Sequence, residues 1–179
     1  SVFGAFAGAV WHFSMVVLFW LVGVVPMALF NVVSTAAWIA AVLIPIRSGR
    51  PEIGAAIVIP ELVLHAFAAT YFVGWSAGFH LLLLLTANTV IDIPKRLRRA
   101  FSLVCVPATT VLYLLMYFWF RDTEPVYRLS ENLYVAIFLF NVGSVVTFLL
   151  LIEVIAIDTA SDGLLALEKL HRRARRLLL

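Results

Sequence analysis

The chain has 179 residues, of which 64% are hydrophobic and 13% charged, and its mean hydropathy is +1.06. Soluble domains are about half apolar and about a quarter charged, so this composition excludes a soluble globular protein. The formal net charge is +3, and the single cysteine, Cys105, excludes a disulfide framework and a cysteine-rich metal site. Because a bilayer-spanning helix needs about 20 apolar residues, the length has room for about six spans.

Apolar runs separated by short polar or charged breaks predict the membrane-spanning helices in chain order. The predicted spans cover residues 3–25, 27–46, 53–74, 77–93, 100–120 and 132–158. Pro26, Pro51 and Pro94 mark three of the breaks. The sequence therefore predicts an all-α integral membrane protein, with a six-transmembrane-helix bundle over residues 1–158.

The basic residues predict how this bundle is oriented. If the loops alternate between the two sides of the membrane, all Lys and Arg except Arg121 and Arg128 fall on one side. The positive-inside rule then predicts that both termini are cytoplasmic, in the inner (plasma) membrane of a bacterial cell. The cluster Arg172–Arg176 is expected to contact acidic lipid headgroups. It has no interleaved aromatic residues, so nucleic acid is not an expected partner.

Residues 159–179 change from uniformly apolar to amphipathic, which predicts a C-terminal cytoplasmic helix that leaves the membrane. Two heptad seams fit this helix equally well, and they share Ala160, Leu167 and Ala174. A helix with two near-equal registers suits a transmitter that switches between two states. The alternative is an amphipathic tail that lies on the membrane surface.

The stretch YFVGWSAGFHLLLLL (71–85) and the exit sequence LEKLHRRARRLLL (167–179) resemble the six-helix membrane domain of bacterial class III adenylate cyclases. The resemblance implies a signal-receiving anchor that controls cyclic AMP synthesis through its exit helix. In that family a catalytic domain, which uses ATP and Mg²⁺, follows this helix, so we expect no catalytic residue within the present segment. Similar stretches occur in input domains of diguanylate cyclases, and a sensor kinase input domain is a further alternative.

The same resemblance implies a homodimer, because class III cyclases build their active site from two chains. In the sequence itself, the support is the heptad seams and two pairs of small residues spaced four apart, Gly4 with Gly8 and Gly143 with Thr147. Some anchors of this type are similar to the cytochrome-b anchors of quinone-linked oxidoreductases. Haem b and a quinone, or another small lipophilic ligand, are therefore expected partners, and an electron-transfer membrane subunit is the alternative function.

His12 and His65 are the first candidate haem ligands. Both lie deep inside predicted spans, and counting the helical rise from the span ends brings them to a similar depth. Small residues one turn away predict a slot beside each imidazole that a flat macrocycle could fill. These residues are Gly8 and Ala9 beside His12, and Ala68 and Ala69 beside His65.

His80 and Met116 are predicted at similar depth near the external side, where they could hold a second haem. The other interpretation of all these histidines is a set of hydrogen-bonded helix contacts, which membrane helices use at least as often.

Two carboxylates complete the candidate residues. Glu61 is four residues before His65, so both side chains share one helix face and can form a local hydrogen bond. Pro60 removes a backbone donor next to Glu61, and such interruptions often accompany a binding site in a membrane helix. Glu153 lies near the cytoplasmic end of the last span, where we expect it to reach water or a basic partner such as Arg47 or Lys95.

Overall fold

The computed structural model describes the backbone of residues 2–86 and 95–177, and no strand occurs among them. The long helices are α1 (Val2–Leu21), α2 (Val25–Ser48), α3 (Glu52–Val73), α5 (Lys95–Phe120) and α6 (Glu131–Leu177). Between α3 and α5 lie two short 3-10 helices, η1 (Trp75–Ala77) and η2 (Phe79–Leu82), and the four-residue helix α4 (Leu83–Thr86).

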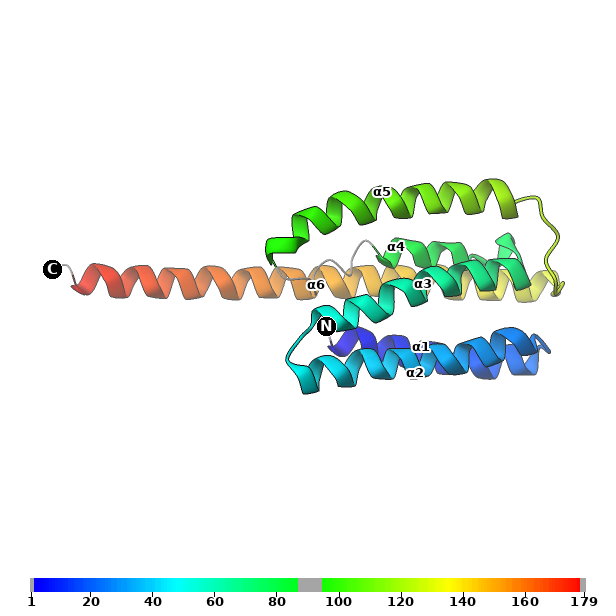
Figure 1. Ribbon diagram of the computed structural model, residues 1–179, viewed down its shortest axis with the longest axis horizontal. Helices are drawn as coiled ribbons and strands as arrows, with labels where there is room; N and C mark the ends of the chain where they lie inside the picture. The colour runs from blue at the N-terminus through cyan, green and yellow to red at the C-terminus, as the bar shows by residue number, and fades with distance from the viewer. Residues whose placement is uncertain (1, 87–94, 178–179) are drawn as a thin grey trace.

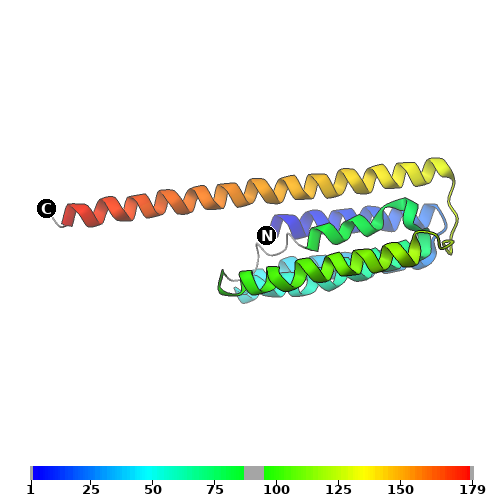
Figure 2. The same ribbon diagram turned by 90° about the horizontal axis from the view of Figure 1, so that it is seen from above.

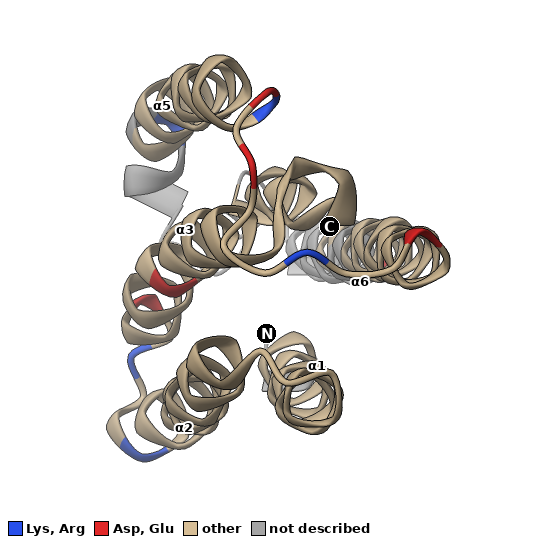
Figure 3. Ribbon diagram, turned by 90° about the vertical axis from the view of Figure 1, so that its right-hand side faces the viewer, with Lys and Arg blue, Asp and Glu red and all other residues tan. Residues whose placement is uncertain are grey.

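All five long helices among the described residues are long and apolar enough to cross a membrane. The long helices lie side by side along one direction (Figure 1). The α1–α2 and α5–α6 connections lie at one end of the bundle, and the α2–α3 connection lies at the other. Figure 3 shows Lys, Arg, Asp and Glu mostly in loops and near helix ends, while the helix interiors are almost free of them. The chain is therefore a helical membrane bundle, as the composition predicts.

The first two helices form an antiparallel hairpin with a very short connection. The predicted break at Pro26 is wrong by a few residues, because the turn occupies residues 22–24 and Gly23 has a positive φ of 77°. Pro26 instead lies in the first turn of α2, where its missing N–H leaves no helical hydrogen bond unmade.

The two helices of this hairpin approach closely at Gly8, which is buried in α1. A Cβ atom built on Gly8 would lie 2.1 Å from the indole ring of Trp38 on α2. The expected slot beside His12 is thus filled by the Trp38 indole, and only glycine fits against it.

Residues 75–86 differ most from the prediction, which gave one regular helix from residue 77 to 93. Gly74 and Gly78 have positive φ values of 102° and 79°, and the chain between and after them forms the two 3-10 turns before α4 begins. The later part of this predicted span, residues 87–93, lies outside the described residues. Most side chains of the segment are buried, and such irregular backbone is tolerated at membrane depth only where protein surrounds it.

The last two helices both extend beyond the predicted spans. α5 begins at Lys95, directly after the predicted break at Pro94, and so starts five residues before its predicted span of 100–120. α6 continues without a break from Glu131 to Leu177, a length of about 70 Å at the helical rise per residue. Figure 2 shows its C-terminal half projecting past the other helices, beyond the end of the bundle where the chain begins.

Candidate functional site

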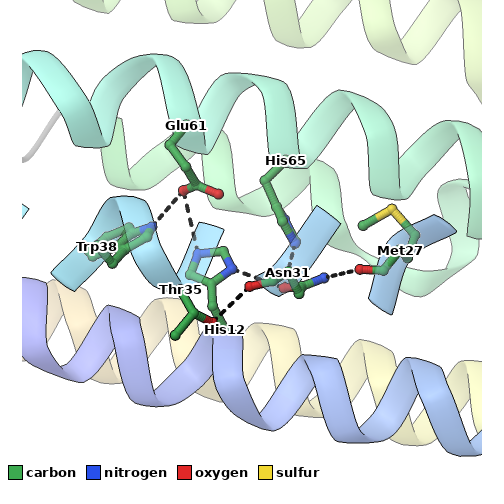
Figure 4. A network of polar contacts seen from close by, with 7 residues as sticks. All are labelled: His12, Met27, Asn31, Thr35, Trp38, Glu61 and His65. Carbon is green, nitrogen blue, oxygen red and sulfur yellow. Dashed lines mark hydrogen bonds and ion pairs between the residues drawn. The ribbon is translucent and has the colours of Figure 1, made fainter. Parts of the chain in front are cut away.

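A cluster of buried polar side chains lies where α1, α2 and α3 meet. α1 contributes His12, α2 contributes Asn31 and Trp38, and α3 contributes Glu61 and His65 (Figure 4). His12, Asn31 and His65 are at most 1% exposed, and Glu61 is 8% exposed. Polar groups at such depth in a membrane bundle are costly unless they are paired, so the cluster is a candidate functional site.

Asn31 joins the two histidines. Its Oδ1 lies 3.0 Å from His12 Nδ1 and 3.2 Å from His65 Nε2. The amide nitrogen fixes the orientation of this side chain, because Nδ2 donates to the Met27 carbonyl at 2.8 Å. Asn31 Oδ1 is therefore an acceptor, and each histidine must present an N–H to it.

Glu61 ties α3 to both other helices through one oxygen. Its Oε2 accepts a hydrogen bond from Trp38 Nε1 at 2.6 Å, and it lies 3.4 Å from His12 Nε2. The predicted local hydrogen bond between Glu61 and His65 does not form, since each side chain reaches a partner on another helix. Two buried acceptors, Glu61 Oε1 and His65 Nδ1, have no hydrogen-bond partner among the described residues.

Aromatic rings enclose the histidines. The Trp11 ring meets His12 and His65 edge-on, with centroid distances of 4.8 and 5.4 Å. Phe30 and Phe79 lie 5.6 and 5.8 Å from the His65 ring. The His65 imidazole is thus held in an aromatic pocket, with Asn31 as its polar contact.

The similar depth predicted for His12 and His65 is confirmed, but the arrangement of the described residues does not fit a haem between the two rings. The ring centroids are 4.8 Å apart and the ring planes stand at 79°. A nitrogen of each ring points at the Asn31 oxygen, in the place that a shared iron would need. A cavity beside His12 measures only about 20 Å³, room for about one water molecule. Haem binding by His12 and His65 stays a prediction.

The second predicted pair, His80 and Met116, lies elsewhere in the bundle. His80 is buried in η2, and its ring stacks on Trp75 at 3.6 Å with an interplanar angle of 5°. Tyr113 of α5 meets both of these rings edge-on. Met116 is buried on α5, the helix that supplies Tyr113. Nothing in the contacts of His80 or Met116 tests them as haem ligands.

The second carboxylate, Glu153, is exposed on α6 and does not belong to the buried cluster. Two neutral residues that sequence reasoning overlooked do belong to the bundle interior. Asn31 and Asn141 are both fully buried, and each is an amide within an otherwise apolar run. An amide within an apolar run is a sequence signal for a buried polar contact, because an unpaired amide is also costly in a bilayer.

A single side chain, that of Trp11, lies between the buried cluster and α6. Trp11, which packs on both histidines, donates from Nε1 to Ser144 Oγ of α6 at 3.2 Å. Its ring also stacks on Phe140 of α6, with centroids 6.3 Å apart. About one helical turn before Ser144, Asn141 Nδ2 donates to the Ala77 carbonyl of the irregular segment at 2.8 Å. Trp11 therefore connects the buried cluster directly to α6.

No protein-family model matches the chain, and searches of curated proteins and of solved structures find no match either. The cluster can hold a proton and can change hydrogen-bond partners, and among the described residues no group of three or more ligating side chains is arranged to bind a metal ion.

Proposed function

We propose that this chain is the membrane anchor and signal-receiving domain of an adenylate cyclase, and that it controls cyclic AMP synthesis through its exit helix. In this proposal the six apolar segments all cross the bacterial plasma membrane, and the projecting half of α6 is the cytoplasmic transmitter. The bundle catalyses nothing itself, and ATP and Mg²⁺ belong to the catalytic domain of the parent enzyme.

The observation that carries the proposal is the continuity of α6. One helix runs from the interior of the bundle, where it contacts Trp11 and Ala77, to Leu177 beyond the bundle (Figure 1). A continuous helix transmits rotation or translation without loss at a flexible joint. An electron-transfer subunit needs no such projecting helix, so this feature favours signalling over electron transfer.

The orientation and the partner follow from the same proposal. The connection between α2 and α3 and the start of α5 lie at the end of the bundle from which α6 projects (Figure 1), and both carry basic residues. The positive-inside rule makes this end cytoplasmic. Homodimerisation is proposed through α6, where a Cβ built on Gly143 meets nothing within 4 Å.

The test is a fusion of residues 1–179 to a cyclase catalytic domain, with insertions after Asp158. Three or four added residues rotate the downstream helix by roughly 300° or 400°, whereas seven nearly restore its phase. We expect the cyclic AMP output of bacteria to change several-fold for insertions of three or four residues and to return towards that of the parent for seven. An output that is the same for every insertion length would reject the transmitter.

Haem and quinone belong to the resemblance and are tested separately. The absorption spectrum of the purified protein decides whether haem is bound at all. A Soret band that disappears in His12→Ala and His65→Ala would establish these ligands, and it would require both imidazoles to leave Asn31. A protein without such a band would leave the signalling proposal intact and remove the redox stimulus.

A further inference from the structure

The hydrogen-bond directions within the buried cluster determine where its protons lie. Asn31 Oδ1 is an acceptor because the Asn31 amide nitrogen donates to the Met27 carbonyl. His12 therefore carries a proton on Nδ1, and His65 carries one on Nε2. One N–H is what a neutral imidazole carries, so the charge of each histidine depends on whether its second nitrogen is also protonated.

The second nitrogen of His12 faces Glu61. His12 Nε2 and Glu61 Oε2 are 3.4 Å apart. If His12 were neutral and Glu61 ionised, a nitrogen lone pair would face a carboxylate oxygen with no proton between them, which is repulsive at this distance. One additional proton on either atom would remove this repulsion.

Trp38 indicates which of the two residues holds that proton. The same Glu61 oxygen accepts the Trp38 N–H at 2.6 Å, and short N–H···O contacts are typical of ionised acceptors. A protonated Oε2 would have to donate to His12 while accepting from Trp38. An imidazolium at His12 and a carboxylate at Glu61 satisfy both contacts.

We propose that His12 and Glu61 form a proton-binding site within the membrane bundle, in which one exchangeable proton on His12 Nε2 fastens α1 to α3. With the proton bound the pair is neutral overall, and attraction between the two charges opposes the cost of removing them from water. When the proton leaves, Glu61 retains its charge and faces a lone pair. The contact between α1 and α3 then becomes repulsive.

The surroundings place no competing charge at this site. From α3, His65 is the other titratable group, and it lies in the aromatic pocket with its Nδ1 unpartnered. α2 presents the neutral Asn31 and Trp38, and η2 presents Phe79 to His65. From α6, Ser144 and Phe140 reach Trp11. Within the described part of the chain, then, the charge on Glu61 is balanced by His12.

The test uses the whole 179-residue chain in lipid nanodiscs, wild type and Glu61→Gln. A glutamine has the same shape, and its oxygen can take the place of Oε2 and accept from Trp38, but it carries no charge to hold a proton on His12. Raising the pH from about 6 to about 10 should lower the thermal unfolding midpoint of the wild type by about 5 °C or more. The Glu61→Gln midpoint should stay flat over this range. Glu52→Gln, the same change in the first turn of α3, should retain the wild-type profile.

Nitrogen-15 NMR of labelled histidine tests the site without relying on stability. We expect one imidazolium signal at pH 8 in the wild type that is absent from His12→Gln and from Glu61→Gln. A wild-type protein in which every histidine is neutral at pH 8 would overturn the proposal. So would an imidazolium signal that persists in Glu61→Gln, or identical pH profiles for wild type and Glu61→Gln.

Discussion

The helices α3 and α5 have the same mean hydropathy over their apolar windows, yet they occupy opposite environments. In α3, 44% of the window is buried inside the bundle, whereas in α5 the share is 6%. α3 carries the buried Glu61 and His65, while α5 presents large apolar side chains such as Phe118 and Trp119 outwards. Hydropathy identifies both as membrane helices and says nothing about which one builds the interior.

The difference teaches what holds this bundle together. Lipid tails are about as apolar as leucine, so burying apolar surface between helices gains little, and packing and polar contacts decide the association. These contacts concentrate where α1, α2, α3 and residues 75–86 meet. Exposed positions on α5 and α6 are expected to tolerate substitutions that the interior does not, and three paired substitutions measure this contrast.

The largest difference is expected between two phenylalanines. Phe79 is fully buried against His65 and Phe19, whereas Phe118 on α5 is 79% exposed. Phe79→Ala leaves a cavity that neighbouring rings cannot fill, at a cost of about 3 kcal/mol in the free energy of unfolding. Phe118→Ala should change it by less than about 0.5 kcal/mol. Unfolding in mixed micelles, followed by circular dichroism, measures both, and equal losses would mean that α5 is packed against protein.

The next contrast compares two glycines on different helices. In Gly8→Ala the new methyl group meets the Trp38 ring, so α1 and α2 must separate, and overpacking of this kind costs about 1–3 kcal/mol. In Gly143→Ala the methyl group meets nothing within 4 Å, and alanine is the better helix former. The same unfolding assay on the monomeric protein should show a loss for the first variant and none for the second. A stable Gly8→Ala protein would contradict the close approach of Trp38.

The sequence predicts the long helices well because the bilayer demands about 20 apolar residues for each span. α3 agrees with its predicted span of 53–74 to within one residue at each end. Prediction fails where a local backbone decides the outcome: Gly23, rather than Pro26, makes the first turn, and Gly74 and Gly78 replace a regular helix by 3-10 turns. Two glycines in an apolar run carry no signal for that choice.

The candidate site was predicted in part. The helical rise predicted a similar depth for His12 and His65, but the prediction placed a macrocycle between the two rings, whose centroids are in fact only 4.8 Å apart. Their actual partners could not be predicted, because Asn31 is uncharged and a search for ionisable groups passes over it. The choice between a hydrogen bond within α3 and contacts across three helices depends on packing, which one helix does not determine.

The smallest of the three effects concerns Asn141, which links α6 to the irregular segment. Its side-chain nitrogen donates to the Ala77 carbonyl at 2.8 Å, and both groups are buried. Asn141→Leu has a similar size but leaves that carbonyl without its donor, at a cost of about 1–2 kcal/mol. Leu139→Asn, two residues earlier at a 62% exposed position, reverses the chemistry and controls for the general effect of an amide on α6.

Hydrogen exchange separates the local effect of Asn141→Leu from a general loss of stability. Exchange should accelerate in residues 75–86, whose 3-10 turns have few backbone hydrogen bonds of their own, while α1 and α2 keep their protection. If exchange rose equally in all helices, the Ala77 contact would not be what holds the segment. A selective rise would show that α6 supports the irregular backbone through one side chain, because in a bilayer no water can replace the missing donor.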